Sequence, residues 1–260
     1  MADGPKRNWY STGYEAVDIE KERIARMSGP NRFWMKEGTK RELVFIDDES
    51  FNVHEHSPKL NGSFRNQFTC LQDAKDIVPC CEKLGPKSRY MCGYFTVIDL
   101  TENIDTKGNK YQYEIKLLPT KLKTLNLIKR KKQDRGSLIG CMFNVHRDSV
   151  DDANCGGEFE FKREADLEKL FKLVNYKGKK LTELYKEAAE KPETMKRLQD
   201  TFQLTLDSSG LIVPKAYSFN YMHVLAPKEP KEIRQMLGAF TPETAANGEA
   251  EAPSDDAIPF

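Results

Sequence analysis

Six side chains that bind soft metal ions are concentrated within 39 residues of the sequence. They are His54, His56, Cys70, Cys80, Cys81 and Cys92. Four Cys or His side chains are enough to hold a zinc ion in tetrahedral geometry. Their spacing is atypical, because no Cys-x-x-Cys pair is present and adjacent cysteines in an extended backbone would point in opposite directions. The sequence leaves two interpretations open, a structural zinc site and a group of buried free thiols.

Catalytic chemistry has weaker support in the sequence. His54-Glu55-His56, together with the acidic residues 47–49, would suit a metal-dependent nuclease. Acidic turns that follow strands are common, however, and the chain contains no Walker loop, no Gly-x-Ser-x-Gly and no His-Glu-x-x-His motif. We therefore expect a protein that is not an enzyme, with a nuclease as an alternative.

Charge is divided unevenly along the 260-residue chain, whose formal net charge is only +1. The last 20 residues contain five acids and no base, so positions 1–240 hold 41 basic and 35 acidic residues. Within residues 104–147 there are eleven bases and three acids, a local charge of +8. This asymmetry favours a polyanionic partner such as nucleic acid, and a solvated basic surface is the alternative.

Aromatic and basic residues are interleaved in the first half of the chain. A sequence-independent binder of single strands needs aromatic faces for the bases and cations for the phosphates. The candidates are Arg32, Trp34, Lys36, Phe51, Tyr94, Tyr111, Tyr113, Lys116, Phe143 and Arg147. About half of the rings in strands should point into the core, and Tyr111 and Tyr113 share a face with Ile115.

The basic run at residues 129–135 is the clearest candidate for phosphate binding. Its cations are Lys129, Arg130, Lys131, Lys132 and Arg135. The run follows a short helical pattern and precedes a predicted strand, so we expect a loop that clamps phosphates. A solvated loop is the alternative.

The C-terminal tail is acidic, yet it ends in apolar residues. Residues 245–253 have no apolar period and are predicted to be disordered. The chain then closes with Asp255, Asp256, Ala257, Ile258, Pro259 and Phe260. The ring and the α-carboxylate of Phe260 suit a pocket with a basic rim, to which the two aspartates add charge attraction. We therefore predict that the tip binds a protein partner, and an accidental ending is the alternative.

This ending resembles the tail of bacterial single-stranded DNA-binding proteins, which closes in Asp-Asp-Asp-Ile-Pro-Phe. Ala257 replaces the third acid of that pattern. The resemblance implies that Asp255, Asp256 and residues 258–260 bind enzymes of replication, recombination and repair. It also implies weak competition with DNA for the basic cleft.

The body of the chain resembles phage-encoded single-stranded DNA-binding proteins over most of residues 31–238. The resemblance lies in Arg-Phe-Trp at 32–34 with residues 44–48 and 54–56, in the cysteine segment leading to residues 93–99, and in residues 224–238. It implies an OB-like barrel that coats single strands during replication in the cytoplasm of an infected bacterium.

T-even phage helix-destabilising proteins are a more distant comparison, similar in the order of cysteines, hairpin and basic segment. Those proteins bind zinc with one histidine and three cysteines. The resemblance implies the ligands His56, Cys70 and Cys80, completed by Cys81 or Cys92. Lys83 stands where the last cysteine of that pattern would be. Residues 6–12 resemble the segment through which those proteins associate with one another on DNA.

The predicted elements place strands before helices. Aromatic and β-branched runs predict strands at 32–36, 42–46, 50–55, 90–100, 137–147 and 157–162, and a hairpin turns at Gly108-Asn109. Helical periodicity predicts helices at 14–28, 167–174, 181–188, 192–202 and 230–237, and residues 217–224 look extended. This order predicts an α+β chain with a small closed sheet, for which the resemblance implies an OB-like Greek-key barrel.

Four segments follow from these patterns. We expect an N-terminal arm and helix (1–30), a DNA-binding core (31–163), a helical extension packed on the core (164–238) and a disordered acidic tail (239–260). No window approaches 18 consecutive apolar residues, and the first thirty residues include five acids, which argues against a membrane or secreted protein. Six cysteines are too few for a disulfide scaffold and favour a reducing cytosol.

Together these observations predict a sequence-independent single-stranded DNA-binding protein that recruits replication and recombination enzymes through its tip. An interaction protein that only mimics this tail is the principal alternative.

Overall fold

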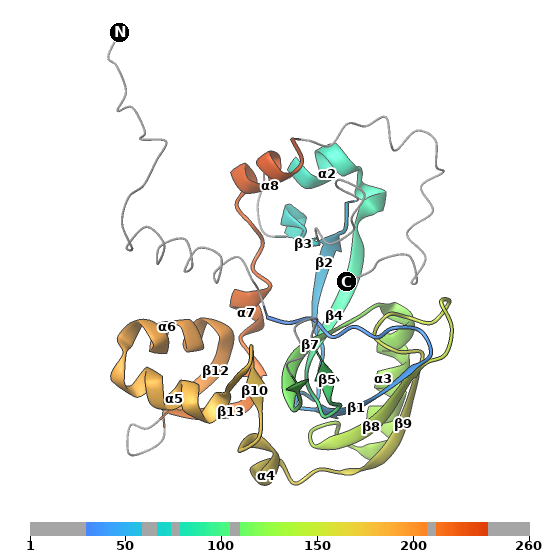
Figure 1. Ribbon diagram of the computed structural model, residues 1–260. Helices are drawn as coiled ribbons and strands as arrows, with labels where there is room; N and C mark the ends of the chain where they lie inside the picture. The colour runs from blue at the N-terminus through green and yellow to red at the C-terminus, as the bar shows by residue number, and fades with distance from the viewer. Residues whose placement is uncertain (1–29, 59–66, 74–78, 105–109, 207–211, 239–260) are drawn as a thin grey trace. The chain divides into compact units, whose positions relative to one another are not determined.

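The computed structural model describes residues 30–58, 67–73, 79–104, 110–206 and 212–238 (Figure 1). The chain divides into two compact units, Met1–Pro30 and Asn31–Phe260, and the description below concerns the second. The predicted helix at 14–28, the turn at Gly108-Asn109 and the acidic tail with its tip lie outside the described residues.

A nine-stranded sheet forms the centre of this unit. Its strands are β1 (Thr39–Phe45), β2 (Phe51–His56), β3 (Phe68–Thr69), β4 (Tyr90–Asp99), β7 (Glu114–Thr120), β8 (Cys141–Arg147), β9 (Glu158–Glu164), β10 (Asn175–Tyr176) and β11 (Lys179–Lys180). The order is β11-β10-β7-β4-β1-β8-β9, and β2 extends the sheet by pairing with β4 and β3. All pairings are antiparallel except that of β10 with β7.

The ten-residue strand β4 is central because it pairs with three neighbours. Its first half pairs with β2, its last residues pair with β1, and β7 lies along its other side. Residues 92–99 of β4 are all buried. Because successive side chains point to opposite faces, Tyr94 and Ile98 enter one hydrophobic cluster while Phe95 and Val97 enter another. Both faces of the sheet are therefore covered.

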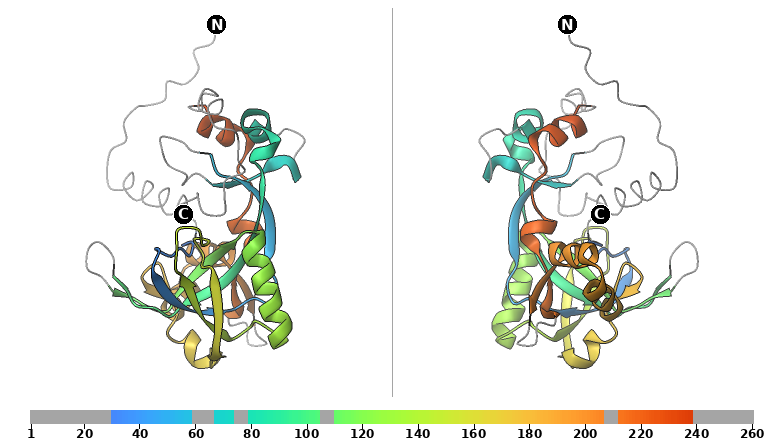
Figure 2. Two further views of the ribbon diagram at one scale, coloured as in Figure 1. Left: turned by 90° about the vertical axis from the view of Figure 1, so that its right-hand side faces the viewer. Right: turned by 90° about the vertical axis from the view of Figure 1, so that its left-hand side faces the viewer.

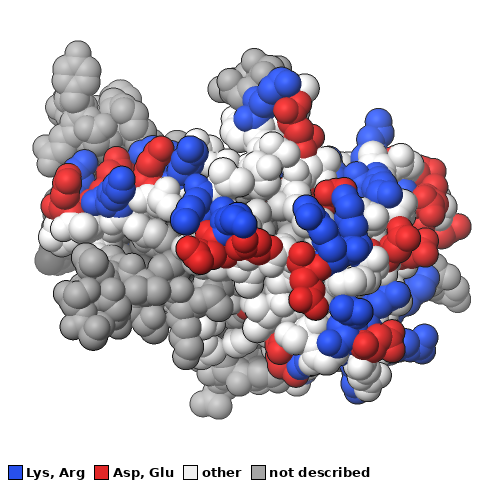
Figure 3. Space-filling model, turned by 90° about the horizontal axis from the view of Figure 1, so that it is seen from below, with Lys and Arg blue, Asp and Glu red and all other residues white. Residues whose placement is uncertain are grey.

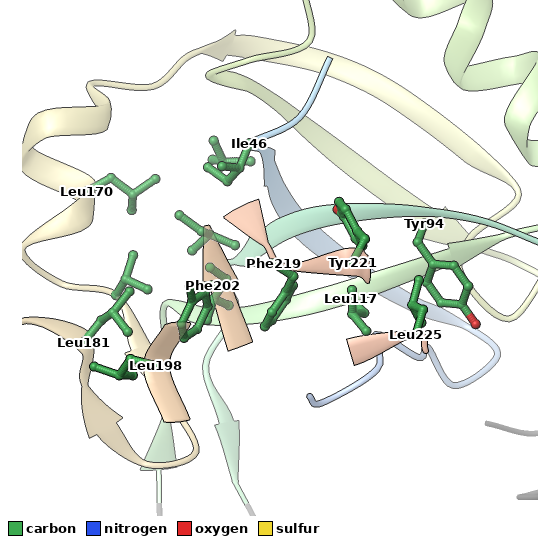
Figure 4. Packing of buried hydrophobic residues seen from close by; sticks show 14 of the residues in the cluster. Ile46, Tyr94, Leu117, Leu170, Leu181, Leu198, Phe202, Phe219, Tyr221 and Leu225 are labelled. Atoms are coloured by element: carbon green, nitrogen blue, oxygen red, sulfur yellow. The ribbon is translucent and has the colours of Figure 1, made fainter. Parts of the chain in front are cut away.

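The first cluster is completed by the C-terminal half of the chain. It includes side chains from α4 (Leu167–Phe171), α5 (Leu181–Glu190), α6 (Pro192–Thr201), the hairpin of β12 (Phe202–Leu206) and β13 (Ile212–Phe219), and α7 (Tyr221–Val224). Phe202 and Phe219 stack with ring centroids 5.1 Å apart, and they lie beside Leu117 and Tyr221 (Figure 4). The predicted core and the predicted helical extension therefore share one hydrophobic cluster.

The second cluster is covered by α3 (Leu122–Arg135), which packs against β4 and β7 (Figure 2). The helix comes close to the sheet at Gly93, where an added Cβ would lie 2.5 Å from a methyl group of Leu125. At its C-terminus Gly136 has φ 82° and donates its backbone N–H to Lys132 O. A glycine in this conformation is a common end of a helix.

A small lobe lies at the far ends of β2 and β4 (Figure 1). It consists of β3, α2 (Pro79–Leu84), α8 (Pro230–Met236) and two short 3₁₀ turns, Leu71–Asp73 and Pro86–Ser88. Its own hydrophobic cluster contains Phe68, Leu71, Ile233 and Leu237 together with Cys70 and Cys80. The C-terminal helix is thus packed against a segment about 150 residues earlier in the sequence, as the hydrogen bond from Lys83 to Leu237 O illustrates.

Comparison with the predictions confirms the α+β class and most of the elements. The predicted closed barrel is not observed. The edge strands β9 and β11 do not pair with each other, so the sheet formed by the described strands is open. Residues 32–36 form only a single bridge, between Arg32 and Leu117. Residues 217–224 divide between the end of β13 and α7. The predicted hairpin is present as β5 (Asn103–Ile104) and β6 (Lys110–Tyr111). Among the described residues, no helix is long and apolar enough to cross a bilayer.

Candidate metal centre and nucleic-acid interface

The lobe brings four potential metal ligands together. One ligand atom each from His56, Cys70, Cys80 and Cys81 lies within 4.8 Å of all the others. Three of the four side chains are buried, and Cys81 is half-buried. This is the ligand set that the sequence suggested, with Cys81 and not Cys92 in the fourth position.

Local structure explains why the two adjacent cysteines can act together. His56 ends β2, Cys70 follows β3, and Cys80 and Cys81 lie in the first turn of α2. The backbone at Cys80 and Cys81 is helical, so the objection that applies to adjacent cysteines in an extended backbone does not apply here. Successive residues on a helix differ in direction by about 100°, so neighbouring side chains can reach one point from a helix end.

The distances fit a tetrahedral ion. Zinc–sulfur bonds of about 2.3 Å at tetrahedral angles place two sulfurs about 3.8 Å apart and a sulfur and a nitrogen about 3.5 Å apart. The observed distances are 3.9 Å from Cys70 Sγ to Cys80 Sγ, 3.5 Å from Cys70 Sγ to Cys81 Sγ and 3.5 Å from Cys81 Sγ to His56 Nε2. The four side chains can therefore ligate a tetrahedral cation without moving far.

His56 is oriented by a second hydrogen bond. Its Nδ1 lies 2.9 Å from Ser88 Oγ, and the Ser88 hydroxyl donates to Gly85 O. Burial and the nearby guanidinium of Arg89 lower the pKa of His56 to about 4, so the ring is neutral at pH 7. A neutral ring that donates from Nδ1 leaves the Nε2 lone pair for a metal.

Burial favours the protonated form of two of the thiols, those of Cys70 and Cys81. Burial, followed by the adjacent Cys70 thiol, raises the pKa of Cys81 to about 12. Burial also raises the pKa of Cys70 above its ordinary value. A bound cation reverses this preference, because a thiol that coordinates a metal loses its proton. Cys92 lies elsewhere, buried in β4 with its sulfur 4.0 Å from Gly93 O.

The carboxylates that suggested a nuclease are engaged in structural contacts. Glu55 is buried and accepts hydrogen bonds from Tyr94 at 2.5 Å, from Tyr90 at 3.3 Å and from Arg32 at 3.3 Å. Asp48 accepts from Leu138 N at 2.6 Å and from a serine hydroxyl, which lowers its pKa against the effect of partial burial. Neither residue belongs to the group of candidate metal ligands found among the described residues.

Two of the predicted stacking rings belong to the core. Tyr94 and Phe143 are no more than 1% exposed, and Phe143 packs edge-on against Phe45 at 5.5 Å. They belong to the half of the strand rings that the sequence predicted to point into the core. Neither ring presents a face to solvent, so we no longer assign them to DNA.

The remaining predicted rings are at least partly accessible. Trp34 is 42% exposed, between the buried Phe33 and Met35. Phe51, Tyr111 and Tyr113 are half-buried. Of these, Phe51 stacks on Tyr221, and nothing in the sequence predicted that these two residues would meet.

Three predicted cations also have structural roles. Arg147 is buried and donates to Met35 O at 2.8 Å. Lys116 is 3.0 Å from both Asp99 and Glu114. Arg32 is held by Glu55 and lies over the ring of Tyr94, 5.2 Å from its centroid. Lys116 and Arg32 are paired with carboxylates, and Arg147 is buried against a backbone carbonyl, so the prediction that these three cations bind phosphates is not supported. Lys36 is exposed.

The predicted basic loop is the second half of α3. The helix continues to Arg135, because Lys, Arg and Gln are good helix formers and nothing in the run terminates it before Gly136. Lys132 pairs with Glu49, and Arg135 pairs with Glu164 and lies over the ring of Phe161.

The other three cations of this run differ from Lys132 and Arg135. Within the described ranges Lys129, Arg130 and Lys131 have no ion pair, and Lys129 and Arg130 are exposed while Lys131 is half-buried. On the face that Figure 3 shows, basic and acidic side chains are interspersed. The α3 end therefore offers three adjacent charges that a phosphate chain could neutralise.

A buried hydrogen-bond network ties the C-terminal segment to β1 and β4. Asp47 accepts from Ser218, from Tyr221 and, at 2.5 Å, from Thr96 N. Thr96 Oγ1 lies 2.7 Å from the Tyr221 hydroxyl and accepts from Phe219 N at 3.0 Å. The network fixes the Tyr221 ring beside Phe51.

We expect Asp47→Ala to destabilise the protein by about 2–5 kcal/mol, because it leaves buried polar partners unsatisfied. Urea unfolding measures this loss. Asp48→Ala is a suitable comparison, because Asp48 accepts its hydrogen bonds from Ser137 and Leu138 and not from the C-terminal segment, and we expect it to cost less. Equal stability of Asp47→Ala and the unmodified protein would contradict the role of the network.

Comparison of the chain with family models, with curated proteins and with solved structures finds no match, so the site must be interpreted from its own residues.

Proposed function

We propose that this chain is a sequence-independent single-stranded DNA-binding protein that acts in replication, recombination and repair. The observation that carries the proposal is the division of charge between a basic body and an acidic tail with an Ile-Pro-Phe tip. A basic body favours a polyanion, and an acidic tail with an apolar tip favours a protein partner.

The end of α3 supports the DNA-binding part of this proposal. Lys129, Arg130 and Lys131 have no ion pair in the described part of the chain, so binding phosphates there breaks no ion pair among the described residues. Neutralising phosphates releases counterions from the nucleic acid, which is the main source of affinity that does not depend on sequence.

We also propose that the four ligands of the lobe, His56, Cys70, Cys80 and Cys81, bind a structural Zn²⁺ ion. Three thiols and one imidazole are ligands that zinc prefers, whereas the Mg²⁺ or Mn²⁺ of a nuclease prefers oxygen. The set of four protein ligands leaves no coordination position for a substrate, as in structural sites. The composition of the site therefore favours a structural role for the ion over a catalytic one.

Titration of oligo-dT at several salt concentrations tests the proposal. We expect binding at low salt that weakens steeply as salt rises. Negligible affinity at low salt would overturn the proposal. If the tip still bound replication enzymes in that case, the chain would be an interaction protein that mimics the tail.

Deletion of residues 258–260 tests the tail separately. We expect the truncated chain to lose recovery of replication and recombination enzymes in pull-downs, while its affinity for oligo-dT is unchanged or higher. The double change Asp255→Asn and Asp256→Asn should weaken recovery less, because it keeps the apolar tip. Equal recovery by the full and truncated chains would contradict a role of the tip in partner binding.

A further inference from the structure

A pocket of about 410 Å³ lies where the C-terminal segment meets the start of β2. Its wall includes Phe51 of β2, Phe202 of β12, and Tyr221 and Met222 of α7. None of the lining side chains is charged. The pocket therefore suits an uncharged, flat and partly apolar group.

Two stacked rings form one side of the pocket. Phe51 and Tyr221 lie 5.3 Å apart between centroids, with an angle of 12° between their planes. Phe51 is half-buried and keeps part of its surface accessible. Met222 beside it is 75% exposed, which is unusual for so large an apolar side chain. A further flat ring could extend the stack and cover this apolar surface.

The rim of the pocket carries amide groups. Asn220 donates its amide nitrogen to Gln199 O at 3.0 Å, and Gln203 donates its amide nitrogen to Phe219 O at 3.3 Å. These bonds leave the amide oxygens of Asn220 and Gln203 as acceptors at the rim. Bases offer ring N–H and amino groups on the edges through which proteins read single strands.

The stacked pair is held in place before any ligand arrives. The Tyr221 hydroxyl bonds to Asp47 and lies 2.7 Å from Thr96 Oγ1, so its ring cannot turn freely. Phe51 is fixed by the pairing of β2 with β4, in which it lies opposite Tyr94. A preorganised aromatic surface loses little conformational entropy on binding.

We propose that this pocket binds one unpaired base of single-stranded DNA by stacking it on Phe51 next to Met222. The inference rests on the proposed function, and it adds a second DNA-binding site, the pocket, to the basic end of α3. The pocket contributes base contacts, whereas the end of α3 contributes phosphate contacts.

The test compares oligo-dT with an abasic oligonucleotide of equal length, which has the phosphates but not the bases. Phe51→Leu keeps apolar volume and removes the aromatic face. We expect it to weaken oligo-dT binding roughly 5- to 150-fold, which corresponds to one lost base stack. The salt slope and the affinity for the abasic strand should not change, because no phosphate contact is lost. Phe51→Tyr should restore binding.

Two further variants keep the test decisive. Met222→Ser alters a side chain that is 75% exposed, so the fold should tolerate it, and we expect the same pattern with a smaller loss of about 5-fold. Phe171→Leu is the matched control. Phe171 is a half-buried ring of the same cluster that stacks on Tyr217 at 3.5 Å and does not line the pocket. It should bind oligo-dT like the unmodified chain.

The outcomes separate the two proposals. Unchanged oligo-dT affinity in both pocket variants, with normal binding by the unmodified chain, overturns the pocket and leaves the proposed function intact. Equal losses for oligo-dT and the abasic strand indicate a structural role and also overturn the pocket. Absence of oligo-dT binding by the unmodified chain overturns both.

Discussion

Cys81→Ala is expected to abolish stoichiometric zinc binding and to unfold the lobe around α2 and α8. The lobe has only a small hydrophobic cluster, and Cys70 and Cys80 are part of it. We therefore expect bound zinc to supply much of the stability of the lobe, since apparent binding free energies of structural zinc reach about 10–16 kcal/mol in small domains. Metal analysis and amide hydrogen exchange of Pro79–Leu84 and Pro230–Met236 measure the two effects.

Cys92→Ala is the matched control for this prediction. It removes the same sulfur atom from a thiol that is more buried than that of Cys81, so loss of packing alone predicts the larger effect at Cys92. If Cys81 is a metal ligand, the larger effect is expected for Cys81→Ala. We expect one zinc ion per chain in the unmodified protein and in Cys92→Ala, and none in Cys81→Ala. Full zinc loading of Cys81→Ala would contradict the proposed ligand set.

A triple change of Lys129, Arg130 and Lys131 to glutamine is expected to flatten the salt dependence of oligo-dT binding. Each phosphate contact on a single strand contributes about 0.7 to the slope of log affinity against log salt, so three contacts contribute about 2. Affinity at 0.1 M salt should fall roughly 100-fold. Glutamine is a good helix former, which keeps α3 intact.

An equal change of charge elsewhere is the control for the basic helix. Lys186, Lys191 and Lys196 are exposed residues of α5 and α6 or of the junction between them. Their exchange for glutamine removes three charges but should change the slope much less, because only long-range attraction is lost. Equal effects of the two triple variants would show that net charge, and not the α3 end, determines binding.

Elements with a clear apolar period could be predicted from the sequence. The helices α5 and α6 lie where their periods place them, because a buried face imposes its spacing on the residues. Strand β4 has no such period, since both of its faces are buried, and its run of aromatic and β-branched residues predicted it instead. The predicted closed barrel was not found among the described strands. Pairing between strands that are distant in the sequence leaves no signal in local spacing. The charge run of α3 was misread as a loop, although its residues favour helix.

The sites were predictable only in part, because contacts between residues far apart in the sequence leave no local signal. His56 and the three cysteines were identified by residue type, but their convergence depends on α2, a six-residue helix too short to show a period. Tyr94 and Phe143 are buried, and their residue type alone could not predict whether a ring in a strand faces the core or the solvent. The stacking of Phe51 on Tyr221 joins residues 170 positions apart and has no local signature.

The hydrogen bond between Asp47 and Tyr221 spans 174 residues, and this separation matters while the chain is being synthesised. A ribosome that adds about 5–20 residues per second needs roughly 10–35 s to extend from one residue to the other. During this interval the sheet face around Val44 and Ile98 lacks the C-terminal residues that cover it. The nascent chain therefore exposes this apolar surface until the residues near Tyr221 have been made, and exposed apolar surface favours aggregation during that time.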